Sequence, residues 1–225
     1  MGRDHLGQFQ MGSDLAFARG VLLLEDCEGT FNWIASGTGG DDVHAFATAA
    51  AFMGGHGMQL KTRTTGTSPN DILTASKNFS FPESGLLVAR CRLAMVQQAA
   101  IKYVGFRVGF CAGAEVYQAR LKHTPATPKV EYQEAGGADV PVAGMGFVTL
   151  DGAFCTLELV VDCLANKYVS LAWNGVRADL AGVALFDGGA ASIRYAYVAL
   201  DVVTVGAAPA EMYVDSVYVG EFLDL

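Results

Sequence analysis

Short runs of alternating apolar and polar residues follow one another along almost the whole chain, and this pattern most restricts what the chain can fold into. Residues 154–163 show the pattern most clearly. One side would carry Cys155, Leu157, Leu159, Val161 and Cys163, and the other Thr156, Glu158 and Asp162. A period of two is typical of a strand buried on one face. Many such strands in one chain predict an all-β fold.

The segments between turn residues predict a two-sheet antiparallel β-sandwich of the jelly-roll kind. Asn174-Gly175 predicts a type I′ hairpin, because both residues tolerate positive φ. A short helix competes with strand in the Ala-rich segment 45–53. The expected strands are 21–26, 31–35, 58–65, 75–81, 86–95, 101–111, 115–122, 130–133, 146–150, 155–163, 167–173, 176–180, 183–186, 193–205 and 212–222.

The chain divides into an N-terminal arm, residues 1–20, and one jelly-roll domain, residues 21–225. The arm is rich in glycine and polar residues, so it would need anchoring to hold a structure. We expect its apolar side chains to bind a partner, either its own domain or a neighbouring subunit. These side chains are Leu6, Phe9, Met11, Leu15 and Phe17.

Composition favours a protein that associates with other subunits. Apolar residues make up 52% of the chain and charged residues only 17%, so surface is available for interfaces and a homo-oligomer is expected. The net charge of −8 argues against nucleic acid as a partner. No apolar stretch is long enough for a membrane-spanning helix, and the first residues lack the apolar core of a secretory signal.

Five cysteines, an odd number, are spread along the chain without a CxxC pair. Buried reduced thiols are the expected state, with a disulfide as the alternative. The histidines show no metal-ligand spacing, and no Gly-x-Ser-x-Gly motif is present.

Three segments resemble a known superfamily. Leu24-Glu-Asp-Cys-Glu-Gly-Thr-Phe-Asn-Trp33 resembles the opening strand of concanavalin A-like jelly-roll domains, Tyr213-Val-Asp-Ser-Val-Tyr-Val-Gly220 resembles their closing strand, and residues 157–175 resemble the middle of the lectin/glucanase type. The resemblance implies that the first and last strands pair. The superfamily includes lectins, glycosidases, binding modules and bacteriophage virion proteins, so the fold does not choose a function.

The resemblance also implies a structural calcium near the paired terminal strands. Its ligands would be Asp26, Glu28 and Asp215, with Asp41 and Asp42 as a second acidic candidate. Asp26 and Glu28 would lie about 6.6 Å apart on a strand, but the Glu-x-Asp-x-x-Glu motif of the glucanase branch is absent. No catalytic residue is therefore predicted.

Two further sets of side chains are candidates for binding. Trp33 and Trp173 are the candidate glycan platforms, whereas Tyr195 and Tyr197 lie in phase with Ile193 and favour the core. Three strands each carry two basic residues on the face opposite the apolar one. They form either separate solvated faces or one docking surface for an acidic partner. The pairs are Lys61/Arg63, Arg90/Arg92 and Arg120/Lys122.

Two functions stay open from the sequence. The first is a non-enzymatic virion protein, such as a capsid decoration component assembled in the host cytoplasm, which packs against copies of itself or a capsid shell protein. The second is a carbohydrate-binding module or lectin of the concanavalin A-like type.

Overall fold

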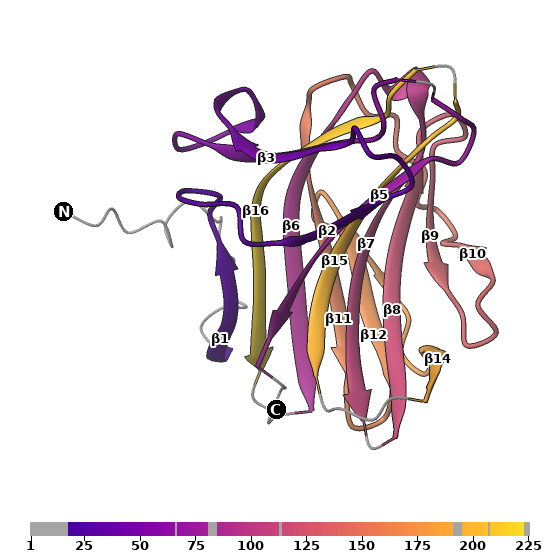
Figure 1. Cartoon of the computed structure of the whole chain (residues 1–225). Helices are drawn as coiled ribbons and strands as arrows, with labels where there is room; N and C mark the ends of the chain where they lie inside the picture. The colour runs from indigo at the N-terminus through magenta and orange to yellow at the C-terminus, as the bar shows by residue number, and fades with distance from the viewer. Residues whose placement is uncertain are drawn as a thin grey trace.

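The computed structural model describes residues 18–65, 67–80, 85–112, 114–190, 195–206 and 208–222. They form two antiparallel sheets packed face to face, as Figure 1 shows. The predicted all-β sandwich is therefore confirmed. No helix in the described ranges is long and apolar enough to cross a membrane. The predicted arm lies mostly outside these ranges, and the first strand begins at Ala18, within the segment that was assigned to the arm.

One sheet, called sheet A, contains both terminal strands. β16 (Glu211–Phe222) pairs with β6 on one side, and with both β4 and β1 on the other. In order across the sheet, its strands are β13 (Val176–Asp179), β12 (Lys167–Trp173), β11 (Phe154–Asp162), β6 (Leu86–Val96), β16, β4 (Gly57–Lys61) and β3 (Val43–Ala47), with β1 (Ala18–Glu25) beside β16.

The other sheet, called sheet B, carries the polar side chains described below. Its central strands are β7 and β15, which pair over nearly their whole lengths. In order across the sheet, its strands are β10 (Asp139–Pro141), β9 (Lys129–Gln133), β8 (Glu115–Thr124), β7 (Ile101–Ala112), β15 (Ala196–Thr204), β5 (Ile72–Phe79) and β2 (Ile34–Gly37), with β14 (Phe186–Ala190) beside β8.

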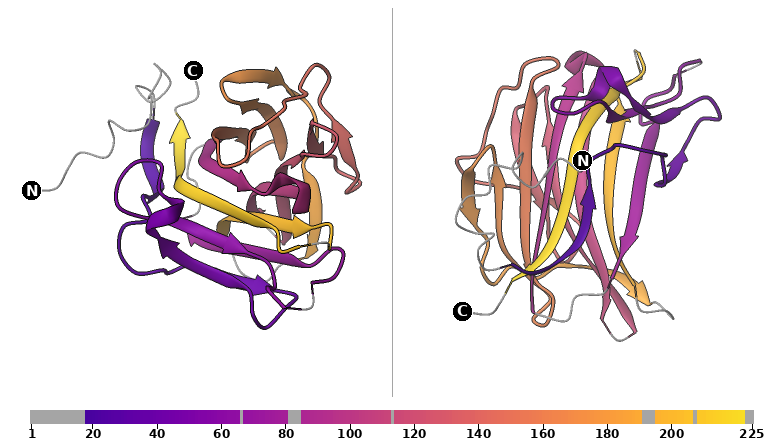
Figure 2. Two further views of the ribbon diagram at one scale, coloured as in Figure 1. Left: turned by 90° about the horizontal axis from the view of Figure 1, so that it is seen from above. Right: turned by 90° about the vertical axis from the view of Figure 1, so that its left-hand side faces the viewer.

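The first and last strands pair, as the resemblance implied. Glu25 lies opposite Val217 and Val21 opposite Gly220 in an antiparallel ladder. Figure 2 shows β1 beside the second half of β16 in both views. The first and last strands of the domain are therefore neighbours in sheet A.

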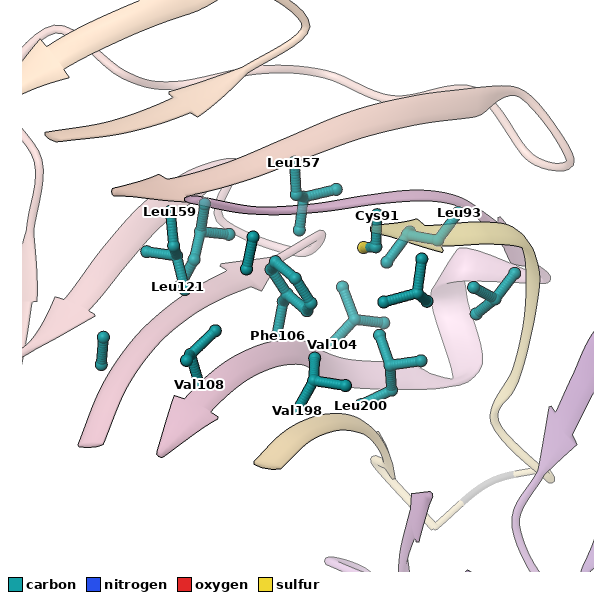
Figure 3. Close-up of a cluster of buried hydrophobic side chains, with 14 of the residues drawn as sticks. Cys91, Leu93, Val104, Phe106, Val108, Leu121, Leu157, Leu159, Val198 and Leu200 are labelled. Atoms are coloured by element: carbon teal, nitrogen blue, oxygen red, sulfur yellow. The ribbon is translucent and has the colours of Figure 1, made fainter. Parts of the chain in front are cut away.

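The core fills the space between the sheets. Figure 3 shows Cys91 and Leu157 of sheet A pointing toward Val104 and Phe106 of sheet B. These side chains are fully buried, and each such apolar side chain contributes about 1.5–3 kcal/mol of transfer free energy. The alternation read at residues 154–163 is confirmed, because Leu157 and Leu159 face this core. All five cysteines are buried free thiols.

The hairpin at Asn174-Gly175 is confirmed. Both residues have positive φ, 47° and 81°, and Trp173 lies opposite Val176. Only two residues separate β12 from β13, so the turn fixes the register of this edge.

Parts of the structure differ from the predicted elements. Of the two alternatives for the Ala-rich segment 45–53, its first three residues belong to strand β3 (Val43–Ala47), and Thr48–Ala50 form a 3₁₀ turn. The expected strand at 146–150 is an irregular loop, because Phe147 packs on Trp173 while Val148 and Leu150 are exposed. The short strand β10 was not predicted, since its residues Asp139–Pro141 include a proline at the edge of the sheet.

Candidate functional site

A set of polar side chains lies on the outer face of sheet B. On β7, Val104, Phe106 and Val108 point into the core, so the alternating residues between them point outward. We call this set the polar face. It consists of Tyr103, Arg107, Gln118, Arg120, Lys122, Glu131, Asp139, Tyr197 and Asp201.

Asp201 organises the centre of the polar face. Its Oδ1 accepts hydrogen bonds from Arg107 Nη2 at 2.5 Å and from Thr74 Oγ1 at 2.7 Å. A Cβ atom at Gly105, the residue opposite, would lie 2.9 Å from Asp201 Oδ2. The glycine therefore leaves space into which the carboxylate leans. The carboxylate is nearly buried, and its charge is balanced by the guanidinium of Arg107.

A second ion-pair network lies toward the edge of the sheet. Lys122 Nζ contacts Asp139 Oδ2 at 2.8 Å and Glu131 Oε2 at 3.0 Å, and Arg120 pairs with the same Asp139. Burial raises the pKa of Asp139, but hydrogen bonds from Lys122 and Arg120 outweigh it and hold that pKa below the usual value. Asp139 is therefore ionised at neutral pH.

Tyr197 and Gln118 form a separate hydrogen-bonded pair on the same face. The hydroxyl of Tyr197 donates to Gln118 Oε1 at 3.0 Å. The tyrosine ring lies against Gly109, where a Cβ atom would come within 2.2 Å of it. Burial raises the pKa of Tyr197, so the hydroxyl stays protonated and can donate.

Tyr103 adds an aromatic ring beside the charges. Lys122 Nζ lies 5.1 Å from the centre of this ring, within cation–π distance. The pKa of Tyr103 is raised, first by burial and then by the Asp201 carboxylate. The half-buried ring thus offers an apolar surface next to hydrogen-bonding groups, which is an arrangement that suits a sugar.

A hollow of about 500 Å³ lies elsewhere, between the edges of the two sheets. It is lined by Tyr132, residues 141–145 and residues 176–180. Arg177 and Asp179 are the charged lining residues, and Arg177 Nη2 contacts Glu158 Oε1 at 2.7 Å. The polar face has the more organised chemistry, so we take it as the candidate site.

Asp215 is placed on a β-bulge of β16, between residues that pair with β6 in shifted register. Its Oδ1 accepts the backbone N–H groups of Phe52 and Met53, both at 3.0 Å, and its Oδ2 lies 3.6 Å from Arg92 Nη1. These contacts fix the loop after Ala50 onto sheet A.

Asp26 and Glu28 follow β1 in irregular backbone rather than within a strand. Asp26 accepts the N–H of Glu28, and Glu28 accepts the N–H groups of Gly55 and His56. In the described ranges, no three Asp, Glu, His or Cys side chains converge as metal ligands. Asp26, Glu28 and Asp215 are therefore not brought together, and the calcium ion stays an untested prediction.

The second acidic candidate anchors a loop. Asp41 accepts hydrogen bonds from the hydroxyl and N–H groups of Thr64 and Thr65, led by the Thr65 hydroxyl, and these lower its pKa to about 2. Asp42 contacts His44 Nδ1 at 3.1 Å.

The three basic pairs do not form one surface. Strands β4 and β6 belong to sheet A and β8 to sheet B, and Arg63 lies beyond the end of β4. Five of the six side chains are engaged with acids of the same chain, and Arg63 donates to a backbone carbonyl. The contacts are Lys61–Glu211, Arg63–Thr38, Arg90–Glu158, Arg92–Asp215, Arg120–Asp139 and Lys122 with both Glu131 and Asp139.

The two tryptophans predicted as glycan platforms are buried. Trp33 donates its Nε1–H to Glu25 Oε2 at 3.0 Å, and Trp173 packs between Phe147 and His123 inside the sandwich. Neither indole can stack on a ligand from solvent. The predicted anchors Leu6, Phe9, Met11, Leu15 and Phe17 lie outside the described residues.

The sequence interpretation missed much of the polar face. Tyr197 was assigned to the core, yet it lies outward beside Gly109. Arg107 and Asp201 were not singled out. The available signal was a charged residue in the middle of each of two long apolar strands, since a buried strand gains nothing from an unpaired charge.

Comparisons with known proteins identify the fold. No protein-family model matches the sequence, and no curated protein matches it. Among solved structures, "Cellulose induced protein, Cip1" is 13% identical, with 88% of this chain and 96% of that chain covered and a TM-score of 0.57. A carbohydrate esterase from Shiga toxin-encoding bacteriophage phi24B is 16% identical, with coverages of 85% and 91% and a TM-score of 0.57. The lectin UEA-II, solved with galactose, is 10% identical, with coverages of 92% and 100% and a TM-score of 0.56.

These similarities show the fold alone. The chain has the jelly-roll fold of concanavalin A-like lectins and glucanases, so the resemblance read from the sequence is confirmed.

Proposed function

We propose that this protein binds saccharides on the polar face of sheet B. One observation carries the proposal: ion pairs with unused hydrogen-bonding capacity lie next to half-buried tyrosine rings on the outer face of one sheet. Sugar hydroxyl groups both donate and accept hydrogen bonds, so they suit a surface that offers arginine, lysine and carboxylate groups together. The C–H surface of a sugar ring can pack on Tyr103 or Tyr197.

The fold supports this proposal. The solved structures that share it include a lectin and a carbohydrate esterase. The lectin-type function was the alternative reading of the sequence, and the geometry of the polar face now makes it the better-supported one.

The proposed function is saccharide binding without cleavage of a glycosidic bond. A glycosidase needs a carboxyl group whose pKa is raised so that it can give a proton to the leaving group. On the polar face, Asp139 has a lowered pKa, and Asp201 and Glu131 are held in ion pairs. These carboxylates fit the role of hydrogen-bond acceptors.

Titration calorimetry with oligosaccharides first selected on a glycan array tests the proposal. Tyr103→Ala should weaken binding about tenfold, because loss of a ring contact is worth roughly 1 kcal/mol or more. Tyr213→Ala, which removes a partly exposed ring from the outer face of sheet A, serves as the matched control and should change the affinity less than about twofold. If Tyr213→Ala abolishes binding and Tyr103→Ala does not, the ligand binds elsewhere and the proposal fails.

Assembly into a larger particle is a second proposal, and it concerns the other side of the molecule. Phe52 is 57% exposed and Met53 40% exposed. Arg92 lies against both, with its guanidinium 5.0 Å from the ring of Phe52. An apolar pair held rigidly at a loop tip favours contact with another protein.

The predicted roles as a homo-oligomer, a capsid decoration component and a virion constituent rest on such contacts and stay untested. Light scattering on the intact chain, on Phe52→Ser and on a chain without residues 1–17 tests self-association. A monomer in all three would remove the homo-oligomer prediction.

A further inference from the structure

Two arginines stand directly opposite each other on the polar face. Arg107 of β7 pairs with Arg120 of β8 in the antiparallel ladder, which places their Cβ atoms about 4.5–5.5 Å apart. Like charges in such a position destabilise a sheet unless they are compensated. Each arginine of the pair is therefore expected to have an anionic partner.

The compensating acids are placed on the outer flanks of the pair. Arg107 Nη2 binds Asp201, which lies on β15, and Arg120 Nη2 binds Asp139, which lies on β10. Because the strand order is β10, β9, β8, β7, β15, the two acids lie on opposite sides of the arginine pair. Among the described residues, no carboxylate forms an ion pair with both arginines.

Both guanidinium groups also keep unused donors. Each makes its side-chain hydrogen bonds through Nη2 alone, and the Nε atoms of both are buried with no acceptor among the described residues. A buried donor without an acceptor is unfavourable, and more so on a charged group. An anion from solvent does not reach the buried Nε atoms, but the two side chains are 22% and 16% exposed, and an oxygen-rich anion at their terminal nitrogens would accept hydrogen bonds and reduce the repulsion.

A carboxylate fits these donors better than a hydroxyl group does. The planar guanidinium offers parallel N–H groups that match the two oxygens of a carboxylate. Tyr103 and Tyr197 lie on the same face and could hold the sugar ring that carries it. The polar face holds three cationic and three acidic side chains, so its charges balance. The attraction of an acidic ligand would therefore come from the two arginines and not from the net charge of the face.

We propose that the saccharide bound by the polar face is acidic, and that one of its carboxylate groups binds between Arg107 and Arg120. This inference rests on the proposed function, because it names the substrate class of the same site.

The test compares matched acidic and neutral ligands by titration calorimetry. The acidic probes are tetramers of galacturonate, mannuronate, guluronate and glucuronate, and the neutral probes are their methyl esters. At least one acid should bind about tenfold or more tightly than its own ester. Raising NaCl from about 50 to 500 mM should weaken the acid several-fold and leave the ester nearly unchanged.

Variants locate the carboxylate. Arg120→Gln should reduce the preference for acid over ester about tenfold. Arg107→Lys keeps a positive charge beside Asp201, so the domain should fold, but it removes the planar fork and should reduce the same preference several-fold. Arg177→Gln, which loses a contact with Glu158 on sheet A, is the control and should leave the preference unchanged.

Two outcomes would overturn the inference in distinguishable ways. If the esters, or neutral sugars from the array, bind as tightly as the acids, the face binds saccharides but the carboxylate assignment is wrong. If no saccharide binds at all, the proposed function fails and the inference fails with it. Acetate alone binding as tightly as the uronate tetramers would mean an anion site without saccharide recognition, which also contradicts it.

Discussion

Acidification should destabilise the sandwich through one buried imidazole. His123 is fully buried, its ring centre lies 4.5 Å from that of Trp173, and its Nδ1 lies 3.1 Å from the carbonyl oxygen of Lys129. The carbonyl can only accept, so Nδ1 carries the proton of the neutral ring. Nε2 is buried and has no hydrogen-bond partner in the described part of the chain, and protonating it would place an uncompensated cation in the core.

The size of the effect follows from the pKa. Burial lowers the pKa of His123 from 6.5 to about 4, although the Lys129 carbonyl and Glu131 act in the opposite direction. Between these two values the unfolded chain binds a proton that the folded chain does not. The free energy of unfolding should therefore fall as the pH drops below 6.5, by about 2 kcal/mol between pH 7 and pH 5, approaching about 3 kcal/mol near pH 4.

Urea unfolding at pH 7 and pH 5, followed by circular dichroism, measures this loss. Carboxylates also titrate, so the informative quantity is the difference between variants. His123→Phe, which keeps a ring against Trp173, should show a pH 7 to pH 5 loss smaller by about 2 kcal/mol. His44→Gln removes an exposed imidazole, leaves His123 in place and should keep the full loss. If His123→Phe loses as much stability as the unchanged protein, the reasoning is refuted.

Three further predictions test other parts of the structure. Gly109→Ala should displace the ring of Tyr197, because the new Cβ would lie 2.2 Å from it, and saccharide affinity should fall. Gly40→Ala, where a Cβ meets nothing within 4 Å, should leave the affinity unchanged. Gly175→Val forces a β-branched residue to φ near 81° and should lower the free energy of unfolding by about 1–3 kcal/mol in urea titrations. A chelator should leave the melting temperature unchanged, because the oxygens of Asp215 are occupied by N–H groups and Arg92. A fall in melting temperature that added calcium reverses would instead support the predicted calcium site.

The sequence predicted the fold where a strand has one polar face. Residues 154–163 alternate clearly, and their inward side chains were identified correctly. The turn at Asn174-Gly175 was also predicted, because few residues adopt positive φ at two successive positions. Both signals are local, and neither depends on which strands become neighbours.

The site could not be predicted in the same way. In β15 nearly every residue from Ala196 to Thr204 is buried, so a period of two does not show which side faces outward. Tyr197 was assigned to the wrong face for this reason. Asp139 and Asp201 meet the same face only through the strand order of sheet B, which alternation along the chain does not encode.

The exposure of large aromatic side chains also could not be predicted from the sequence. Trp173 precedes a turn, which suggested partial exposure, but the loop carrying Phe147 covers it. Such coverage depends on a loop with no pattern of its own, and the same loop was mistaken for a strand.

Saccharide binding at the polar face is tested most directly by backbone NMR during titration with the tightest oligosaccharide from the array. The resonances of Arg107, Arg120 and Asp201 should shift in a saturable way, with their neighbours on β7, β8 and β15. Those of β11 and β12 on the opposite sheet should stay in place. Shifts confined to sheet A, or to the hollow beside β13, would contradict the proposed site.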